Sequence, residues 1–327
     1  MTADTRDEPR SLVAGVDVGG TKVAVLIVDA EDRLLGRAIR PMGGGGTAGV
    51  EQVVGAIRAA LADASADASA LAAIGIGVPG RIDPNAGVVG LATNLDWEDL
   101  PLATLIEDRL GVPCSVENDV GLAASGLAVH PIADGARSLA YVAVGTGIGA
   151  GLVLDGELRR GDRGMAGEIG HVIVDPEGAA CRCGQRGCLE TVASGPHIAR
   201  RAVEAGLTGA DPITARTVFE AAAAGDPTAR AVADETGRVL ARAVAGLILT
   251  CDLDLVLLGG GVTGAGAPFL DPLVAELGRL RAASPLVASL IPVGAVRALP
   301  ADFDPVAWGG VALARRQKEV VARTPLS

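Results

Sequence analysis

Four residues between positions 171 and 188 have the types and spacing of a metal site. His171 precedes Cys181, Cys183 and Cys188, and glycines at 184 and 187 let the loop between the cysteines turn tightly. Three thiolates and one imidazole complete the four-coordinate set of structural zinc sites, with no position left for water. The sequence therefore predicts a structural zinc ion in this loop.

Two other states of these cysteines are open at this point. They could be buried free thiols, or two of them could form a disulfide. The chain contains five cysteines, an odd number, and has no signal peptide or long apolar N-terminal segment. This pattern favours a protein of the reducing cytoplasm, where such spacing indicates metal binding more often than a disulfide.

Three glycine-rich turns at strand ends are candidates for binding phosphate groups. The turns contain Gly19, Gly20, Thr21 and Lys22; then Thr146 and Gly147; and finally Gly260. Backbone N–H groups in such turns can approach phosphate oxygens closely. Asp17, just before the first turn, could hold Mg²⁺, which prefers one or two carboxylates together with substrate phosphates. Each turn alone could be a plain hairpin, but three together favour a nucleotide-binding site between two lobes.

A short acidic segment, Glu117-Asn118-Asp119, follows an apolar run. We expect it at the carboxyl end of a strand in an α/β lobe, where ligands tend to bind. An aspartate there can accept the proton of a hydroxyl that attacks phosphorus. The alternative is an ordinary acidic turn.

Composition excludes several classes of function. The 327 residues carry a net charge of −11 without a basic stripe, and no uncharged apolar segment reaches membrane-spanning length. We therefore expect neither nucleic acid nor a membrane as a partner. No P-loop motif occurs. Gly75–Gly80 matches the dinucleotide-binding spacing, but Pro79 favours a turn over the start of a helix, so we reject a dehydrogenase.

Hydrophobic patterning predicts an α/β fold with an internal repeat. Residues 12–28 predict a hairpin around the first glycine turn, and residues 139–154 repeat this layout around the second. Further strands are expected at 72–78, 112–116 and 253–258, and helices at 50–62, 102–110, 119–128, within 196–250, from 268 onward and at 308–322. Alternating strands and helices indicate two α/β lobes.

Taken together, the motifs resemble the ROK family of sugar kinases and regulators, particularly its bacterial glucokinases. They occur here in order: Asp17-x-Gly-Gly-Thr-Lys22, Asn118-Asp119, Gly145-Thr-Gly-Ile-Gly149, Glu168-Ile-Gly-His171 and Cys181-x-Cys-Gly-x-x-Gly-Cys-x-Glu190. The resemblance extends from about residue 13 to 313. It implies a two-lobed actin-like, ribonuclease-H-like (hexokinase-type) ATPase fold with a zinc-binding loop, commonly in a homodimer or a dimer of dimers.

In domain terms, residues 1–11 are expected to be disordered. A small lobe would comprise 12–119 and 309–327, and a large lobe 120–308 with the zinc loop and the dimer surface. The resemblance implies Asp119 as the general base. The implied sugar-binding residues are Gly80, Asn94, Asn118, Asp119, Glu168, His171 and Glu190, and the implied ATP-facing residues are Gly20, Thr21, Thr146, Gly147 and Gly260. Mg²⁺ would bind near Asp17, and one nitrogen of His171 would bind zinc while the other donates to the sugar.

The resemblance implies ATP-dependent phosphorylation of the 6-hydroxyl of a hexose, most simply glucose. Two segments depart from the family pattern, Ala124–Leu127 and Ala301–Gly310. An alternative is therefore a kinase for an amino sugar, such as kanosamine or N-acetylmannosamine, or for a C7-cyclitol. Another is a non-catalytic sugar sensor. Only sixteen residues precede Asp17, so we do not expect the helix-turn-helix domain of the family's repressors.

Overall fold

The computed structural model describes residues 11–209 and 211–323, so nearly all of the predicted disordered segment 1–11 lies outside the described residues. The chain forms two compact units. The first takes in the described residues of Met1–Ile132, Gly161–Gly164 and Asp304–Ser327. The second consists of Ala133–Arg160 and Met165–Phe303, with residue 210 left out.

A five-stranded mixed sheet of order β3-β2-β1-β4-β8 forms the centre of the first unit. The strands are β1 (Leu12–Val18), β2 (Lys22–Val28), β3 (Leu34–Pro41), β4 (Leu71–Val78) and β8 (Cys114–Asn118). β1, β2 and β3 form an antiparallel meander, whereas β4 pairs in parallel with β1 and β8 in parallel with β4. The predicted hairpin at 12–28 is confirmed.

Helices pack on both faces of this sheet, as the alternation of β1 side chains shows. Ala14 and Val16 belong to a core that includes residues of α1, whereas Val13 packs with Val311 and Ala314 of α10. The helices are α1 (Gly46–Asp63), α2 (Leu102–Leu110), α3 (Asp119–Leu127) and α10 (Pro305–Arg323). A small antiparallel sheet, β5 (Arg81–Asp83), β6 (Val88–Ala92) and β7 (Trp97–Leu100), and the short turns η1 (Ala68–Ala70) and η2 (Thr93–Leu95) complete the unit.

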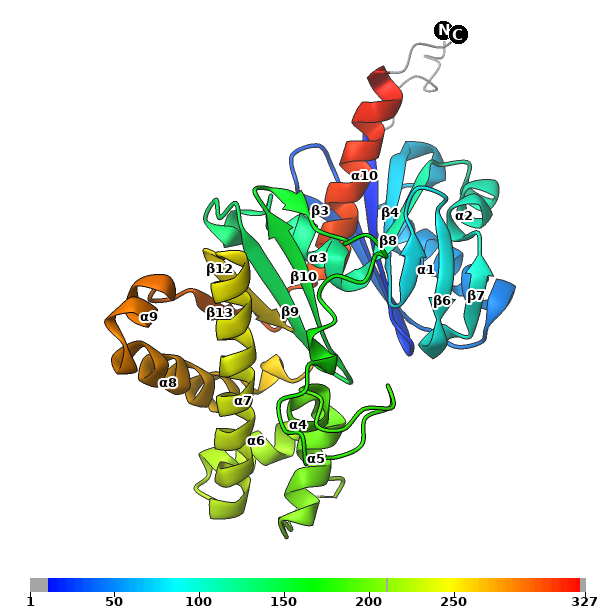
Figure 1. Cartoon of the computed structure of the whole chain (residues 1–327). Coiled ribbons are helices and arrows are strands. Elements are labelled where there is room, and N and C mark those ends of the chain that lie inside the picture. Colours follow the sequence, from blue (N-terminus) through cyan, green and yellow to red (C-terminus); the bar gives the residue numbers. More distant parts are fainter. Residues whose placement is uncertain (1–10, 210, 324–327) are drawn as a thin grey trace, which may run out of the picture. The chain divides into compact units, whose positions relative to one another are not determined.

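Glycines allow α10 to lie directly on β1 and β4 (Figure 1). A Cβ atom on Gly15 would lie 2.0 Å from the carbonyl oxygen of Ala307, and one on Gly75 would lie 2.1 Å from that of Gly310. Both distances are far below any van der Waals contact, so backbone touches backbone here. The position of α10 on the sheet therefore depends on the absence of side chains at these residues.

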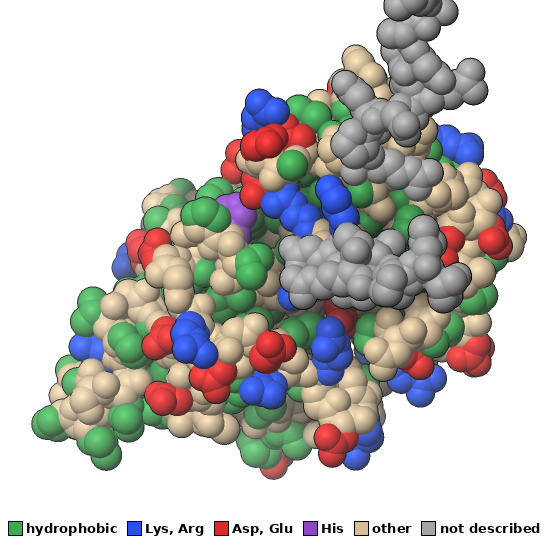
Figure 2. All heavy atoms as spheres, turned by 90° about the horizontal axis from the view of Figure 1, so that it is seen from above, with side chains coloured by type: hydrophobic (Ala, Val, Ile, Leu, Met, Phe, Trp, Pro, Cys, Tyr) green, Lys and Arg blue, Asp and Glu red, His purple; other side chains and the backbone are tan. Residues whose placement is uncertain are grey.

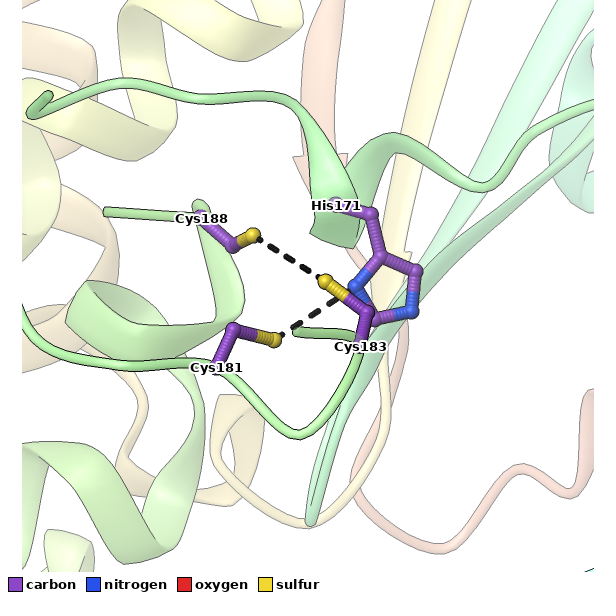
Figure 3. Close-up of side chains that lie close together, drawn as sticks. All are labelled: His171, Cys181, Cys183 and Cys188. Atoms are coloured by element: carbon purple, nitrogen blue, oxygen red, sulfur yellow. Dashed lines mark hydrogen bonds between the residues drawn. The ribbon is translucent and has the colours of Figure 1, made fainter. Parts of the chain in front are cut away.

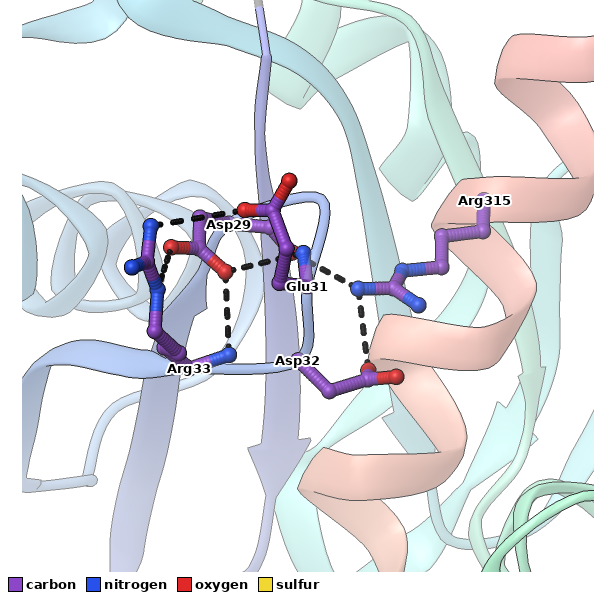
Figure 4. A network of polar contacts seen from close by, with 5 residues as sticks. All are labelled: Asp29, Glu31, Asp32, Arg33 and Arg315. Atoms are coloured by element: carbon purple, nitrogen blue, oxygen red, sulfur yellow. Dashed lines mark hydrogen bonds and ion pairs between the residues drawn. The ribbon is translucent and has the colours of Figure 1, made fainter.

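Arg315 joins α10 to the turn between β2 and β3 (Figure 4). Its guanidinium donates to the carbonyl oxygen of Asp29 at 2.7 Å and pairs with Asp32 at 2.9 Å. Within the turn, Asp29 accepts from the N–H groups of Glu31 and Arg33. The turn thus presents a preformed set of acceptors to the helix.

The second unit contains a sheet with the same strand arrangement. Its order is β11-β10-β9-β12-β13, with an antiparallel meander of three strands followed by two parallel ones. The strands are β9 (Leu139–Val144), β10 (Ile148–Leu154), β11 (Glu157–Leu158), β12 (Leu255–Gly259) and β13 (Val296–Ala298). The internal repeat predicted from the two hairpins is therefore confirmed at the level of topology.

Alanine-rich helices pack around this second sheet. Their composition favours helix formation, because alanine has the highest helix propensity. They are α4 (Glu190–Ala193), α5 (Gly195–Glu204), α6 (Ala215–Ala223), α7 (Pro227–Cys251), α8 (Ala267–Ala283) and α9 (Pro285–Leu290), with the short turns η4 (Ile169–His171) and η5 (Thr263–Ala265). The short turn η3 (Pro131–Ala133) contains the point where the chain passes from the first unit to the second. Phe219 and Phe269 meet edge to face, with ring centroids 5.6 Å apart. This pair ties α6 to α8.

The starts of α10 and β8 differ from the predicted ones, and the backbone at Gly80 agrees with prediction. The last helix begins at Pro305 and not at Trp308, because Asp304 caps it and proline suits the first helical position. Strand β8 begins at Cys114, two residues later than predicted, and runs to Asn118. Gly80 has a φ of +109° and leads into β5 rather than a helix, which agrees with rejecting a dinucleotide-binding motif.

The contacts between helices and strands place α3 and all of α10 in the first unit, whereas the predicted small lobe ended at residue 119 and resumed at 309. The physical reason is a second glycine contact. A Cβ atom on Gly126 of α3 would lie 2.4 Å from the Cα atom of Gly309. The units accordingly divide after Ile132 and before Asp304.

Within the described ranges, no helix combines the length and apolar content that crossing a bilayer would need. Figure 2 shows one face of the protein, where acidic and basic side chains lie interspersed.

We expect Gly75→Ala to lower the free energy of unfolding by about 1–3 kcal/mol, because the added methyl group forces α10 away from β4. Gly55→Ala is the matched control. Gly55 lies on the exposed side of α1 with open space around it, so alanine there should stabilise by about 0.5–1 kcal/mol. Urea unfolding of both variants measures the difference, and equal stability of the two would contradict the close contact.

Candidate functional site

The carboxylate of Asp17, at the end of β1, lies near two other acidic groups of the first unit. Asp17 is partly buried. Removal from water raises the pKa of Asp17 well above its ordinary value, the charges of Asp304 and Asp119 raise it further, and Lys22 opposes them. Carboxylates next to a glycine turn are the donors that a divalent cation prefers in nucleotide sites, so this group fits Mg²⁺.

Asp304 was not among the predicted site residues. The residue caps α10, with its Oδ1 accepting from the N–H of Ala307 at 3.0 Å. The same position brings its charge near Asp17. The role of Asp304 as the N-cap of α10 could have been predicted from the pair Asp304-Pro305, which precedes an apolar periodic run. The nearness to Asp17 could not, because it arises only when α10 packs on β1.

Asn118 and Asp119 lie where β8 passes into α3. The side-chain oxygen of Asn118 accepts from the N–H of Gly121 at 3.0 Å, and its amide donates to the carbonyl oxygen of Gly80 at 3.1 Å. Asp119 begins α3, and its Oδ1 accepts from the N–H of Val120 at 2.9 Å. The structure therefore brings three of the predicted sugar-site residues together at the carboxyl ends of the neighbouring strands β4 and β8.

The first glycine turn lies between β1 and β2. The N–H of Gly19 donates to the carbonyl oxygen of Lys22 at 2.9 Å and closes the turn. Thr21 and Lys22 are exposed. Gly20 packs against Asn94, since a Cβ atom on Gly20 would lie 3.3 Å from the Asn94 carbonyl oxygen. Asn94 thus lies beside the predicted phosphate turn.

The second unit brings the four predicted metal ligands into one cluster (Figure 3). Their ligand atoms all lie within 4.8 Å of one another. The Sγ atoms of Cys183 and Cys188 are 3.6 Å apart, and Sγ of Cys181 is 3.7 Å from Nδ1 of His171. Two sulfur ligands of a tetrahedral zinc ion, each bonded at about 2.3 Å, lie about 3.8 Å apart. The cluster fits a zinc ion in both donor type and spacing.

The state of the thiols bears on the two alternatives to a zinc site, which are buried free thiols and a disulfide. All five cysteines are free, and the 3.6 Å between Cys183 and Cys188 is far longer than a disulfide bond of about 2.05 Å. Burial raises the pKa of Cys188 to about 12, whereas the backbone N–H of Gln185 lowers the pKa of Cys183. Zinc binds thiolates, so metal binding must release protons. The structure contains no disulfide among its five cysteines, and the geometry of the cluster is that of free thiols or of metal ligands.

The two ring nitrogens of His171 face different groups. Nδ1 faces the cysteines, and Nε2 lies 4.0 Å from Oε2 of Glu168. A metal on Nδ1 would leave the proton on Nε2, since neutral imidazole carries only one. The prediction that one nitrogen binds metal and the other donates to a ligand requires this arrangement of the two nitrogens.

The turn between β9 and β10 contains Thr146 and Gly147. The N–H of Gly145 donates to the carbonyl oxygen of Gly147 at 3.0 Å. Glu190, the first residue of α4, faces this turn, with Oε2 2.8 Å from the position that a Cβ atom on Gly147 would take. Gly260 follows β12 and packs on Val144, the last residue of β9. A Cβ atom on Gly260 would lie 2.6 Å from the carbonyl oxygen of Val144. These residues form one group within the second unit.

The predicted site residues thus fall into two groups, one in each unit. The first unit holds Asp17, Gly19, Gly20, Thr21, Lys22, Gly80, Asn94, Asn118 and Asp119, and the second holds Thr146, Gly147, Glu168, His171, Cys181, Cys183, Cys188, Glu190 and Gly260.

Comparison with known proteins places the chain in a family. The model of the ROK family matches residues 13–296. A glucokinase of Halalkalibacterium halodurans is 36% identical over 274 residues, covering 79% of this chain and 83% of that protein. An N-acetylmannosamine kinase of Yersinia pestis is 36% identical over 266 residues, covering 80% of this chain and 86% of that protein.

A solved structure gives the same result. The ROK family glucokinase from Streptomyces griseus, in complex with glucose and AMPPNP, is 34% identical with a TM-score of 0.76. The match covers 93% of this chain and 99% of that one. With the family model matching most of its length, the chain belongs to the ROK family and has that family's hexokinase-type α/β fold.

Proposed function

We propose that this protein transfers the γ-phosphoryl group of ATP to the 6-hydroxyl of a hexose, with glucose as the main substrate. The glucokinase relative and the glucokinase structure with glucose and AMPPNP support the assignment. The observation that carries it is the junction of β8 and α3. There Asp119 begins a helix beside Asn118, whose side-chain oxygen and amide group are held by Gly121 and Gly80.

Asp119 acts in this proposal as the general base. Its carboxylate accepts the proton of the 6-hydroxyl as that oxygen attacks phosphorus. Phosphoryl transfer demands little covalent chemistry from the protein, so the remaining residues mainly position groups and neutralise charge. The glycine turns would place backbone N–H groups on the ATP phosphates, and Asn94, Glu168, His171 and Glu190 would contact sugar hydroxyls.

Two metal ions belong to the proposal. The Cys/His cluster would hold a structural zinc ion, which supplies a fixed loop geometry. Asp17 would hold Mg²⁺ through water, and this ion supplies positive charge to the phosphates. The homodimer or dimer of dimers and the cytoplasmic location remain predictions from the sequence.

A second candidate is N-acetylmannosamine kinase. The Yersinia pestis enzyme of that name is as similar to this chain as the glucokinase, at 36% identity. A site built to hydrogen-bond a given hydroxyl rejects an analogue lacking it by a large factor. Measured sugar preference therefore separates the two candidates clearly.

Asp119→Asn should lower kcat by roughly 10²–10⁴-fold, because the amide cannot accept a proton. Sugar affinity should change little, since the amide oxygen can still accept a hydrogen bond. ADP release from MgATP with glucose, mannose, glucosamine, N-acetylmannosamine, kanosamine and a valiolone-type cyclitol measures turnover, and calorimetry measures sugar binding.

The control for this variant is Asp108→Asn, which removes an exposed carboxylate of α2 in the same unit. Full activity of Asp119→Asn would contradict the base assignment. Turnover of N-acetylmannosamine in preference to glucose would favour the second candidate, and a preference for kanosamine or the cyclitol would favour a specialised kinase. No ADP release with any of these sugars would favour the non-catalytic sensor.

The purified protein should contain one zinc ion per chain, and Cys183→Ser should lose it, because three donors hold the ion less tightly than four. Cys251→Ser is the control, since Cys251 lies outside the cluster on α7. Elemental analysis gives the metal content. Zinc removal should also lower the melting temperature. Stoichiometric zinc in Cys183→Ser, or none in the unaltered protein, would contradict the assignment.

Asp17→Asn should stabilise the metal-free protein at neutral pH while lowering turnover. The folded pKa of Asp17 lies above its ordinary value of 3.8, so this residue's contribution to stability is present in acid and is lost as the pH rises through the raised pKa. The gain from asparagine should therefore shrink as the pH falls toward 4. Urea unfolding between about pH 4 and pH 8 tests this, and a variant no more stable than the original at pH 8 would refute it.

A further inference from the structure

Glu190 connects two features of the second unit, the Cys/His cluster and the β9–β10 turn. It begins α4, two residues after Cys188, and is only 5% exposed. One carboxylate oxygen lies 3.6 Å from Sγ of Cys181. The other lies against Gly147, 2.8 Å from where a Cβ atom would be. The buried carboxylate is therefore wedged between a predicted metal ligand and a predicted phosphate turn.

The metal loop is the segment 171–188 that carries the Cys/His cluster, and its two arms are the residues just before and just after it. Backbone contacts hold both arms against the β9–β10 hairpin. Just after α4, the N–H of Gly195, the first residue of α5, donates to the carbonyl oxygen of Gly145 at 2.8 Å. On the other arm, Gly170 lies so close to β10 that a Cβ atom would be 2.2 Å from the carbonyl oxygen of Ile148. Because no side chain separates these backbones, displacement of either arm displaces the turn.

We propose that Glu190 is a positioning residue through which the metal-bound geometry of the cluster sets the shape of the β9–β10 turn. The inference rests on the proposed function, in which this turn binds ATP phosphates. A metal ion fixes Cys181 and Cys188 relative to each other, and this fixes the start of α4 and the carboxylate that supports Gly147. Without the metal the loop relaxes and the turn loses that support. Zinc would thus control nucleotide binding as well as the sugar side of the site.

The first measurement is MgADP binding by calorimetry, without sugar, to zinc-loaded and zinc-depleted protein. The chelator is removed by gel filtration before Mg²⁺ is added. We expect depletion to weaken MgADP binding roughly tenfold, within the usual range of coupling between two sites. Hydrogen exchange in the absence of nucleotide should show faster exchange at residues 145–149 after depletion.

Two substitutions separate positioning from sugar contact. Glu190→Ala removes the wedge, so MgADP binding should weaken and its dependence on zinc should disappear. Glu190→Gln keeps nearly the same shape, so it should restore zinc-dependent MgADP affinity while the KM for the sugar stays raised. The control is Glu276→Gln, another buried carboxylate of this unit, which pairs with arginines of α7 and α8. This change should leave MgADP affinity and its zinc dependence unaltered.

Each outcome distinguishes this inference from the proposed function. MgADP binding that is equal with and without zinc overturns the inference and leaves the kinase assignment standing. No MgADP binding by the zinc-loaded protein overturns both. Should Glu190→Ala fail to fold, hydrogen exchange in the unaltered protein decides alone, and unchanged protection of residues 145–149 on zinc depletion refutes the coupling.

Discussion

Direct contact between backbones, possible only at glycine, sets the spacing of the functional groups in both units. In the first unit, Gly15 and Gly75 let α10 rest on β1 and β4, and this brings Asp304 near Asp17. In the second, Gly170 lets the residues before the Cys/His cluster lie directly on β10, and Gly147 leaves room for the carboxylate of Glu190. Protein interiors are close-packed, so a single added methyl group at such a contact shifts a whole element. The chain's many glycines are in this sense part of the site.

The electrostatic arrangement around Asp17 follows from that spacing and opposes stability. A carboxylate withdrawn from water beside two others is unfavourable when ionised. In the proposed function, such a group would suit a cation that arrives with its nucleotide, because the cation would compensate the charge that the folded chain does not. The Cys/His cluster poses a related problem. Burial raises the pKa of Cys188, and a metal ion stabilises the thiolate that burial disfavours. Both sites are thus arranged to gain more from a bound ion than an exposed site would.

The sequence predicted more of the chemistry than of the packing. The two hairpins, the duplication and the gathering of His171 with three cysteines were predicted correctly because each depends on local residue types with specific spacing. The start of α10 was missed because the capping signal of Asp304-Pro305 lay outside the expected helix. The contacts of Gly75 with Gly310 and of Glu190 with the β9–β10 turn were beyond prediction. They join segments distant in sequence, and a glycine or buried glutamate carries no local mark of what it will touch.

The route of the chain gives the first unit a particular order of assembly. Its sheet is built from residues before Asn118, but the helix that covers Gly15 and Gly75 comes from Pro305–Arg323. At ribosomal speeds of about 5–20 residues per second, that sheet face waits roughly 10–40 s for its cover. Meanwhile the second unit emerges and has all its own strands at hand. We infer that the second unit completes first during synthesis, and that the apolar face of β1 and β4 is the surface that chaperones would encounter.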